Sequence, residues 1–241
     1  MRIALFSDTH GNLATLEAVL AEIRRDAVDH LICLGDVAIF GPQPRETLHL
    51  VRTLACPVVM GNTDAWALNP HPHAERNRDT PKFNAIELWS ATQLSDNDRN
   101  FIRTFQPTVT LALDNGASLL AYHGSPRSFN EGIVATTADS TLVDYFADAQ
   151  ATVLAGGHTH APFMRRWHDK IVLNPGSVGL PYETLADGSV RNPPWAEYAI
   201  LTCEASRTNV ELRRTPVDRA AVRAAVQQSA MPFGDWWLNG E

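Results

Sequence analysis

The stretch Phe6-Ser7-Asp8-Thr9-His10-Gly11-Asn12 joins an apolar run to an amphipathic segment. The run before it, residues 3–6, predicts a buried strand. After it, apolar side chains recur at the spacing of a helix, at Leu13, Leu16, Leu20 and Ile23. Asp8 and His10 therefore lie on the turn that leaves the C-terminal end of a strand, where open α/β sheets build their sites. A carboxylate and an imidazole at that edge are candidate ligands for a divalent transition metal.

Two further predicted strands end in the same kind of turn. Residues 31–34 lead into Gly35-Asp36, and residues 57–60 lead into Gly61-Asn62-Thr63-Asp64. A helix is expected between them, over residues 46–54. The order strand-helix-strand-helix-strand predicts a parallel sheet with right-handed crossovers.

Residues 65–106 depart from this alternation and are expected to form a helical insert or cap over one edge of the sheet. Helices are predicted over 83–92 and 95–105, and the second begins with the capping pattern Ser95-x-x-Asp98. His71 and His73 lie in a proline-rich loop and are interpreted as solvent-exposed; a lid over the site is the alternative.

The rest of the chain alternates hairpins with short helices. Hairpins are predicted over 108–122, 163–173 and 198–214, a strand over 152–155, and helices over 140–149 and 217–228. Trp236 and Trp237 in the tail are expected to fold back onto apolar surface, with a dimer contact as the alternative. We expect one domain over residues 1–241, with the insert at about 65–106 and the C-terminal helix and tail at about 216–241.

Bulk properties narrow the class of protein. The chain has 241 residues and a formal net charge of −7, which argues against a broad nucleic-acid surface. No apolar run approaches the roughly 20 residues that span a bilayer, and the N-terminal run is too short for a secretory signal. Cys33, Cys56 and Cys203 are scattered, which predicts no disulfide and a reducing cytoplasm. The sequence does not determine the oligomeric state of the protein, and an oligomer is one alternative.

Polar residues at the ends of the predicted strands form one ordered series. It contains two aspartates, one asparagine and four histidines: Asp8, His10, Asp36, Asn62, His123, His158 and His160. Seven ligands are too many for one tetrahedral zinc. They suit two ions about 3.5–4 Å apart that share a carboxylate, an arrangement that clamps both oxygens of an in-line displacement at phosphorus. Two divalent cations against two carboxylates leave a positive site, which favours a phosphate anion.

This series resembles the calcineurin-like metallophosphoesterases. The matching blocks are Asp8-x-His10, Gly35-Asp36, Gly61-Asn62-x-Asp64, His123 and Gly157-His158-x-His160, and 174–179 (Asn-Pro-Gly-Ser-Val-Gly) extends the likeness to the smaller bacterial phosphodiesterase branch. The resemblance implies a four-layer αββα sandwich, two mixed β-sheets flanked by helices. It also implies one metal held by Asp8, His10, Asp36 and His160, and a second held by Asp36, Asn62, His123 and His158, with Asp36 bridging.

One position departs from the family pattern. Many members carry a histidine, taken to serve the leaving group or the phosphate, where this chain has Thr63. A hydroxyl can hydrogen-bond phosphate but is a poor general acid near pH 7, so weaker or more selective catalysis is expected. Asp64, without that histidine, is expected to cap the following helix or to orient groups behind the ligands.

The hypothesis from sequence is a cytoplasmic phosphoesterase acting on a small phosphate ester, with Mn²⁺, Fe or Zn²⁺ as the metals. Metal-bound hydroxide is the expected nucleophile, and Asp36, Asn62 and His123 are the expected catalytic residues. Asn62, Thr63 and Arg127 are the candidate substrate contacts, and Arg127 is equally interpreted as a surface residue. Two alternatives stay open: a metal-binding scaffold without turnover, favoured by Thr63, and a nucleotide-binding sensor.

Overall fold

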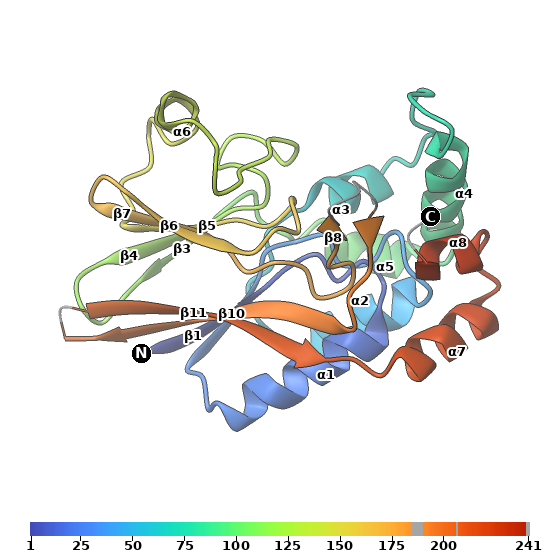
Figure 1. Ribbon diagram of the computed structural model, residues 1–241, viewed down its shortest axis with the longest axis horizontal. Helices are drawn as coiled ribbons and strands as arrows, with labels where there is room; N and C mark the ends of the chain where they lie inside the picture. The colour runs from blue at the N-terminus through green and yellow to red at the C-terminus, as the bar shows by residue number, and fades with distance from the viewer. Residues whose placement is uncertain (185–189, 206, 240–241) are drawn as a thin grey trace.

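Two mixed β-sheets pack face to face in the computed structural model, which describes residues 1–184, 190–205 and 207–239 (Figure 1). The first sheet has the order β11-β10-β1-β2 and the second β3-β4-β5-β7-β6. The first sheet contains β1 (Arg2–Phe6), β2 (His30–Cys33), β10 (Trp195–Glu204) and β11 (Arg207–Pro216). The second contains β3 (Val109–Ala112), β4 (Ser118–Ala121), β5 (Val153–Ala155), β6 (Phe163–Trp167) and β7 (Lys170–Asn174).

Strand β1 is buried on both faces, which explains its unbroken apolar run. It pairs parallel with β2 and antiparallel with β10. Ile3 and Leu5 point into the core between the two sheets, whereas Ala4 and Phe6 point toward the helices. The predicted strand-helix-strand unit is confirmed, and its C-terminal strand ends lie at one edge of the sandwich.

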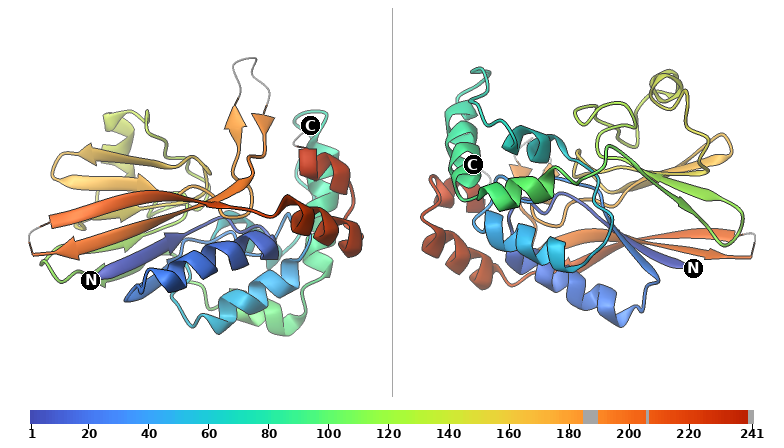
Figure 2. Two further views of the ribbon diagram at one scale, coloured as in Figure 1. Left: turned by 60° about the horizontal axis from the view of Figure 1, so that its bottom comes forward. Right: turned by 180° about the vertical axis from the view of Figure 1, so that it is seen from behind.

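Helices cover the outer face of the first sheet. They are α1 (Leu13–Arg25) and α2 (Pro44–Thr53), whose apolar sides join the core on that face. The outer face of the second sheet carries α6 (Asp139–Tyr145), whose Leu142 packs with Leu154 and Val172 of the sheet. The four-layer αββα sandwich expected from the resemblance is therefore confirmed (Figures 1 and 2).

A group of helices lies at one end of the sandwich, on the right of Figure 1. It contains α4 (Thr80–Thr92), α7 (Arg219–Ser229) and α8 (Gly234–Asn239), which share a small core of Ile86, Val222, Val226, Met231 and Trp237. The inward folding of the C-terminal tryptophans is thus confirmed for Trp237, whose indole N–H donates to the Phe40 carbonyl at 2.6 Å. Residues 240–241 of the predicted tail lie outside the described residues.

Several sequence predictions need correction at their boundaries. Residues 57–60 are not a full strand: Val58 and Val59 form isolated parallel bridges to Cys33 and Gln106, because the extended segment is too short for a continuous ladder. The segment 65–106 begins inside α3 (Asn62–Ala67), which the sequence analysis missed, and also holds α4 and α5 (Asp96–Ile102). The capping box of Ser95 and Asp98 on α5 is confirmed. The small hairpin of β8 (Glu183–Thr184) and β9 (Val190–Arg191) was also missed.

The three cysteines are free thiols, as predicted, and Cys33 and Cys203 are buried. Across the described residues, no helix combines the length and the apolar character needed to cross a bilayer.

Candidate metal centre

The loops after β1 and β2 are joined by a ladder of backbone hydrogen bonds. Asp8, His10 and Gly11 donate their N–H groups to the carbonyls of Gly35, Asp36 and Val37 at 2.9–3.0 Å. This pairing continues the parallel sheet beyond the strands, so the two loops turn together. It places Asp8, His10 and Asp36 at one edge, where the sequence predicted them.

Five candidate ligands have left-handed backbone conformations. The φ angles of Asp8, His10, Asp36, His158 and His160 lie between 45° and 68°. Residues with a Cβ rarely adopt this region, and it is concentrated at functional sites. The reversal turns each side chain out of its strand direction and toward a common centre.

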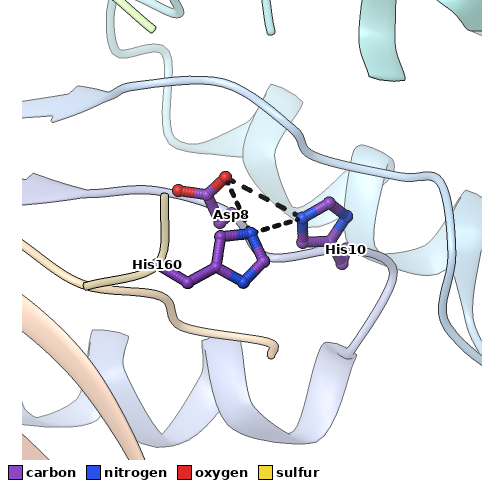
Figure 3. A group of neighbouring side chains, drawn as sticks. All are labelled: Asp8, His10 and His160. Atoms are coloured by element: carbon purple, nitrogen blue, oxygen red, sulfur yellow. Dashed lines mark hydrogen bonds and ion pairs between the residues drawn. The ribbon is translucent and has the colours of Figure 1, made fainter. Parts of the chain in front are cut away.

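The first cluster consists of Asp8, His10 and His160 (Figure 3). His160 Nε2 lies 3.2 Å from Asp8 Oδ1 and 3.1 Å from His10 Nε2. His10 Nε2 is 3.8 Å from the same carboxylate oxygen. Three ligand atoms from the loops after β1 and β5 thus surround one point.

The second cluster consists of Asp36, His123 and His158, with the Asn62 amide beside them. His123 Nε2 lies 3.4 Å from Asp36 Oδ2 and 3.0 Å from Asn62 Oδ1. His158 Nδ1 lies 2.9 Å from the same amide oxygen. All seven residues of the predicted series therefore converge.

Asp36 lies between the clusters. Its Oδ2 is 3.4 Å from His123 Nε2 in one cluster and 3.7 Å from His10 Nε2 in the other. Its Oδ1 accepts a hydrogen bond from the Thr63 backbone N–H at 2.9 Å, which fixes the carboxylate plane. This is the geometry expected of a carboxylate shared by two cations.

The histidine rings fit a metal role because their outer nitrogens already have partners. The Nδ1 atoms of His10, His123 and His160 lie 2.9, 2.7 and 2.7 Å from the carbonyls of Ile39, Leu34 and Leu180. A carbonyl only accepts, so each Nδ1 carries a proton, and each Nε2 faces inward, where a neutral ring offers a lone pair. Converging Nε2 atoms need a cation between them, either a proton shared with a carboxylate or a metal ion.

Two oxygen atoms support the same conclusion. Asp8 Oδ1 is buried and has no hydrogen-bond partner among the described residues. The Asn62 amide oxygen faces His123 and His158; turning the amide over would offer both rings an N–H, whereas a bound cation favours the oxygen in its present place. The donor set of imidazole, carboxylate and amide oxygen suits Mn²⁺, Fe or Zn²⁺.

The charges of the cluster oppose the effect of burial. Burial would lower the pKa of His123, but Asp36 raises it to about 10. Burial would raise the pKa of Asp8, but His160 holds it below its usual value. His10, by contrast, has its pKa lowered by burial and stays neutral. Without cations the two carboxylates depend on charged histidines, and bound cations would replace those protons.

Asp64 connects α3 to the loop that carries Asp36. Its fully buried carboxylate accepts backbone N–H bonds from Asp36 at 2.8 Å, Val37 at 3.0 Å and Gly61 at 3.1 Å. Burial and the nearby Asp36 charge raise the pKa of Asp64 to about 7. The predicted roles of helix cap and orienting residue are both present in this geometry.

Thr63 lies on the cavity side of Asp36. Its hydroxyl is buried, and no other described residue offers it a hydrogen bond. Thr63 also lines the cavity beside the clusters, although its hydroxyl oxygen is itself buried.

Arg127 is the one sequence candidate that the structure does not bring to the clusters. Its guanidinium pairs with Glu131 at 2.9 Å and Asp144 at 2.7 Å and lies over the Tyr145 ring. It lines a separate depression near α6. Its ion pairs hold it there, so the surface interpretation applies and the substrate contact is withdrawn.

The loop of residues 174–179 supports the ligand loops from below. The Asn174 amide donates to the Gly157 carbonyl at 2.7 Å, and the Ser177 hydroxyl donates to the Asp8 carbonyl at 2.8 Å. In the sequence, this motif is identified only by its resemblance to the family. Its position shows that it holds the loops of Asp8 and His158 together.

A cavity of about 400 Å³ opens beside the clusters. Five candidate ligands and Thr63 form its floor. Its walls come from distant parts of the chain, which carry no local chemical motif and which the sequence analysis therefore missed: Phe40, Phe83, Glu87, Leu180, Tyr182, Asn192, Trp236 and Trp237.

His71 and His73 lie outside the described lining of that cavity. His73 is half-exposed, stacks on Trp66 with ring centres 5.9 Å apart, and places Nε2 2.9 Å from Glu87 Oε2. His73 therefore contacts Glu87, a residue of the cavity wall, and not the candidate ligands.

Comparison with known proteins identifies the family. The protein-family model of the calcineurin-like phosphoesterase superfamily domain matches residues 1–206 of this chain. An uncharacterized protein of Methanocaldococcus jannaschii is 28% identical over 205 residues, which cover 78% of this chain and 80% of that protein. A symmetrical bis(5'-nucleosyl)-tetraphosphatase of Methylococcus capsulatus is 31% identical over 133 residues, covering 54% of this chain and 45% of the relative.

Solved structures with a similar fold agree with this result. A metallophosphoesterase from Sphaerobacter thermophilus has a TM-score of 0.75 and 26% identity, and the match covers 100% of this chain and 99% of that one. A hypothetical protein from Pyrococcus horikoshii has a TM-score of 0.81 at 18% identity, covering 100% and 98%, and supports the fold alone.

Proposed function

Because this chain belongs to the calcineurin-like phosphoesterase superfamily, we propose that it hydrolyses a small phosphate ester with two divalent metal ions. Asp8, His10, Asp36 and His160 would hold one ion, and Asp36, Asn62, His123 and His158 the other. The observation that carries the proposal is the convergence of three imidazole Nε2 atoms, each with its Nδ1 at a backbone carbonyl, around two buried carboxylates.

Two bound cations would neutralise the phosphate and lower the pKa of water, which is the chemistry of two-metal phosphoesterases. The chain's own residues set the geometry. Asp36, whose Oδ1 accepts the Thr63 N–H, would be shared by the two ions, and Thr63 would lie beside the phosphate.

The same residues indicate which kind of leaving group the site can release. With Thr63 in place of the family histidine, this position offers no side chain that gives up a proton near neutral pH. Esters whose leaving group departs as a weakly basic anion, such as aryl phosphodiesters, need that proton least. We therefore propose a phosphodiesterase preference, with Mn²⁺ as the first metal to test and the cytoplasm as its location.

A metal-binding scaffold is the second candidate, and Thr63 is the observation that favours it. Such a protein would bind two ions and turn over no ester. The intact set of seven converging side chains favours the enzyme.

The test is hydrolysis of bis(p-nitrophenyl) phosphate with added Mn²⁺, in the wild type and in Asp36→Asn. We expect metal-dependent turnover that Asp36→Asn abolishes, and Asp98→Asn, which alters a buried carboxylate on α5 away from the clusters, serves as the matched control. Turnover unchanged by Asp36→Asn overturns the assignment of the shared carboxylate. Two bound Mn²⁺ ions without turnover of any of a panel of phosphate esters would select the scaffold.

A further inference from the structure

The wall of the cavity opposite the clusters is aromatic. Phe40 and Phe83 stack with ring centres 4.9 Å apart and an interplanar angle of 15°. Trp236 meets the edge of Phe83 at 5.2 Å and 81°. The three rings come from a loop, from α4 and from α8, so the wall exists only because the C-terminal helices fold against α4 (Figure 1).

The wall is fixed in place but not covered. The Trp237 indole N–H holds the Phe40 carbonyl at 2.6 Å, and Lys82 lies 5.0 Å from the Trp236 ring. Phe83 and, across the cavity mouth, Tyr182 are 41% and 46% exposed. Large aromatic faces that stay open beside a cluster of polar ligands are typical of a small-molecule site, in which apolar walls bind and a few polar groups orient.

The charge of the cavity limits what can enter. No lysine or arginine is among its described lining residues, whereas Glu87 and Asp36 are. The undescribed segment 185–189 contains no basic residue either. Lys82, the nearest cation on α4, pairs with Asp79 at 2.9 Å. Among the described lining residues, therefore, no lysine or arginine would neutralise a second or third phosphate.

We propose that this cavity binds the organic half of the ester as an uncharged, flat aromatic group, such as a nucleobase, attached to a single phosphate at the metal centre. The group stacks on one of the Phe83 and Trp236 rings and meets the other edge-on, because the two planes are 81° apart, while the phosphate lies at the metal centre. This inference rests on the proposed function for the position of the phosphate. It argues against a dinucleoside polyphosphate as the substrate, although one relative that matches over part of its length is named as a tetraphosphatase.

Binding tests the subsite without requiring turnover. Calorimetry on the Mn²⁺-loaded protein compares thymidine 5′-monophosphate with 2-deoxyribose 5-phosphate, which share the sugar and the phosphate and differ in the aromatic base. Base–aromatic stacking predicts a preference for the thymidylate of roughly 5- to 100-fold. Trp236→Ala should reduce that preference, and so should Phe83→Leu, which keeps an apolar side chain. Tyr145→Ala, an aromatic deletion on α6, is the control and should leave the preference intact.

Turnover gives the second readout. Thymidine 5′-(p-nitrophenyl phosphate) and methyl p-nitrophenyl phosphate release the same leaving group, so their ratio of kcat/KM reports the other ester group alone. We expect the ratio to favour the thymidine ester and to fall in both wall variants. Equal affinity of the two monophosphates, or a ratio that neither wall variant changes, overturns the subsite while leaving the phosphoesterase proposal intact. Faster hydrolysis of diadenosine tetraphosphate overturns the single-phosphate limit, and absence of all turnover with a retained binding preference overturns only the proposed function.

Discussion

Replacing Gly157 with alanine tests whether the loop after β5 fixes the position of Asp8. A Cβ at this position would overlap the Ser7 hydroxyl and lie 2.8 Å from Asp8 Oδ2. Ordinary van der Waals contact begins near 3.4 Å, so the Asp8 carboxylate has to give way by about 0.6 Å. The backbone of Gly157 itself needs no left-handed conformation, so the substitution acts through its contacts with Ser7 and Asp8.

The displacement gives the expected size of the effect. A misplacement of about 1 Å in a catalytic group can cost about 100-fold in rate, so we expect roughly a tenfold loss of kcat/KM in Gly157→Ala. Disturbing a group that supports metal ligands typically lowers metal affinity by about 10- to 100-fold. Overpacking of this kind should also cost about 1–3 kcal/mol of unfolding free energy.

The assay combines calorimetric titration of the EDTA-treated protein with Mn²⁺, urea unfolding, and hydrolysis of bis(p-nitrophenyl) phosphate. Gly132→Ala is the matched control, because its added methyl would touch only Thr159 Cγ2 at 3.4 Å. Gly132→Ala should stay within about 0.5 kcal/mol of the wild type. A Gly157→Ala protein that binds Mn²⁺ as tightly as the wild type would refute the role of this loop in placing Asp8.

Three further predictions concern the shared carboxylate, the metals and a buried acid. Asp36→Asn should bind one Mn²⁺ where the wild type binds two, as counted by calorimetry; two ions in the variant would contradict the bridging geometry. Removal of metal with EDTA should lower the melting temperature, since a ligand at 100 times its Kd adds about 2.7 kcal/mol, and an unchanged melting temperature would show that no metal is bound. Burial would raise the pKa of Asp98, but hydrogen bonds from Ser95 and His49 lower it to about 2. Because this folded pKa lies below the unfolded value of 3.8, the stabilisation is present above about pH 4 and is lost as the pH falls toward 2. Asp98→Asn should therefore cost about 2 kcal/mol in urea unfolding at pH 5 and less at pH 3, and an equal cost at both would exclude this account.

The sequence was most informative where a buried strand is followed closely by a ligand. Asp8, Asp36 and His158 each follow a short buried strand, and the period of the apolar residues locates such strands without knowledge of the fold. The parallel strands β1 and β2 end at one edge, which brings Asp8 and Asp36 together, whereas His158 follows a strand of the second sheet and meets them because the two sheets pack face to face. That is why the candidate ligands could be collected before any geometry was known.

The same logic could not find the cavity wall. Phe40, Phe83 and Trp236 are ordinary apolar residues in segments with no shared pattern, and each lies in its place only after α8 folds onto α4. The tail of Trp236 and Trp237 was correctly expected to fold back, but its target was not in the local sequence. The substrate contact proposed for Arg127 rested on its closeness to His123 along the chain. That closeness could not reveal the ion pairs with Glu131 and Asp144, which hold the Arg127 side chain away from the clusters.

The left-handed backbone of the ligands gives a thermodynamic reason for the surrounding hydrogen bonds. Each non-glycine residue in this region costs roughly 1–2 kcal/mol, and five candidate ligands adopt it. The backbone bonds of Asp8, His10 and Gly11 to the Asp36 loop, together with the Asn174 and Ser177 side chains, oppose relaxation of those turns. The chain therefore holds these ligand atoms in a converging arrangement that needs protons or metal cations between them. Because the arrangement is built in advance, cation binding loses little free energy to ordering the loops, and its attraction to Asp8 and Asp36 appears as affinity.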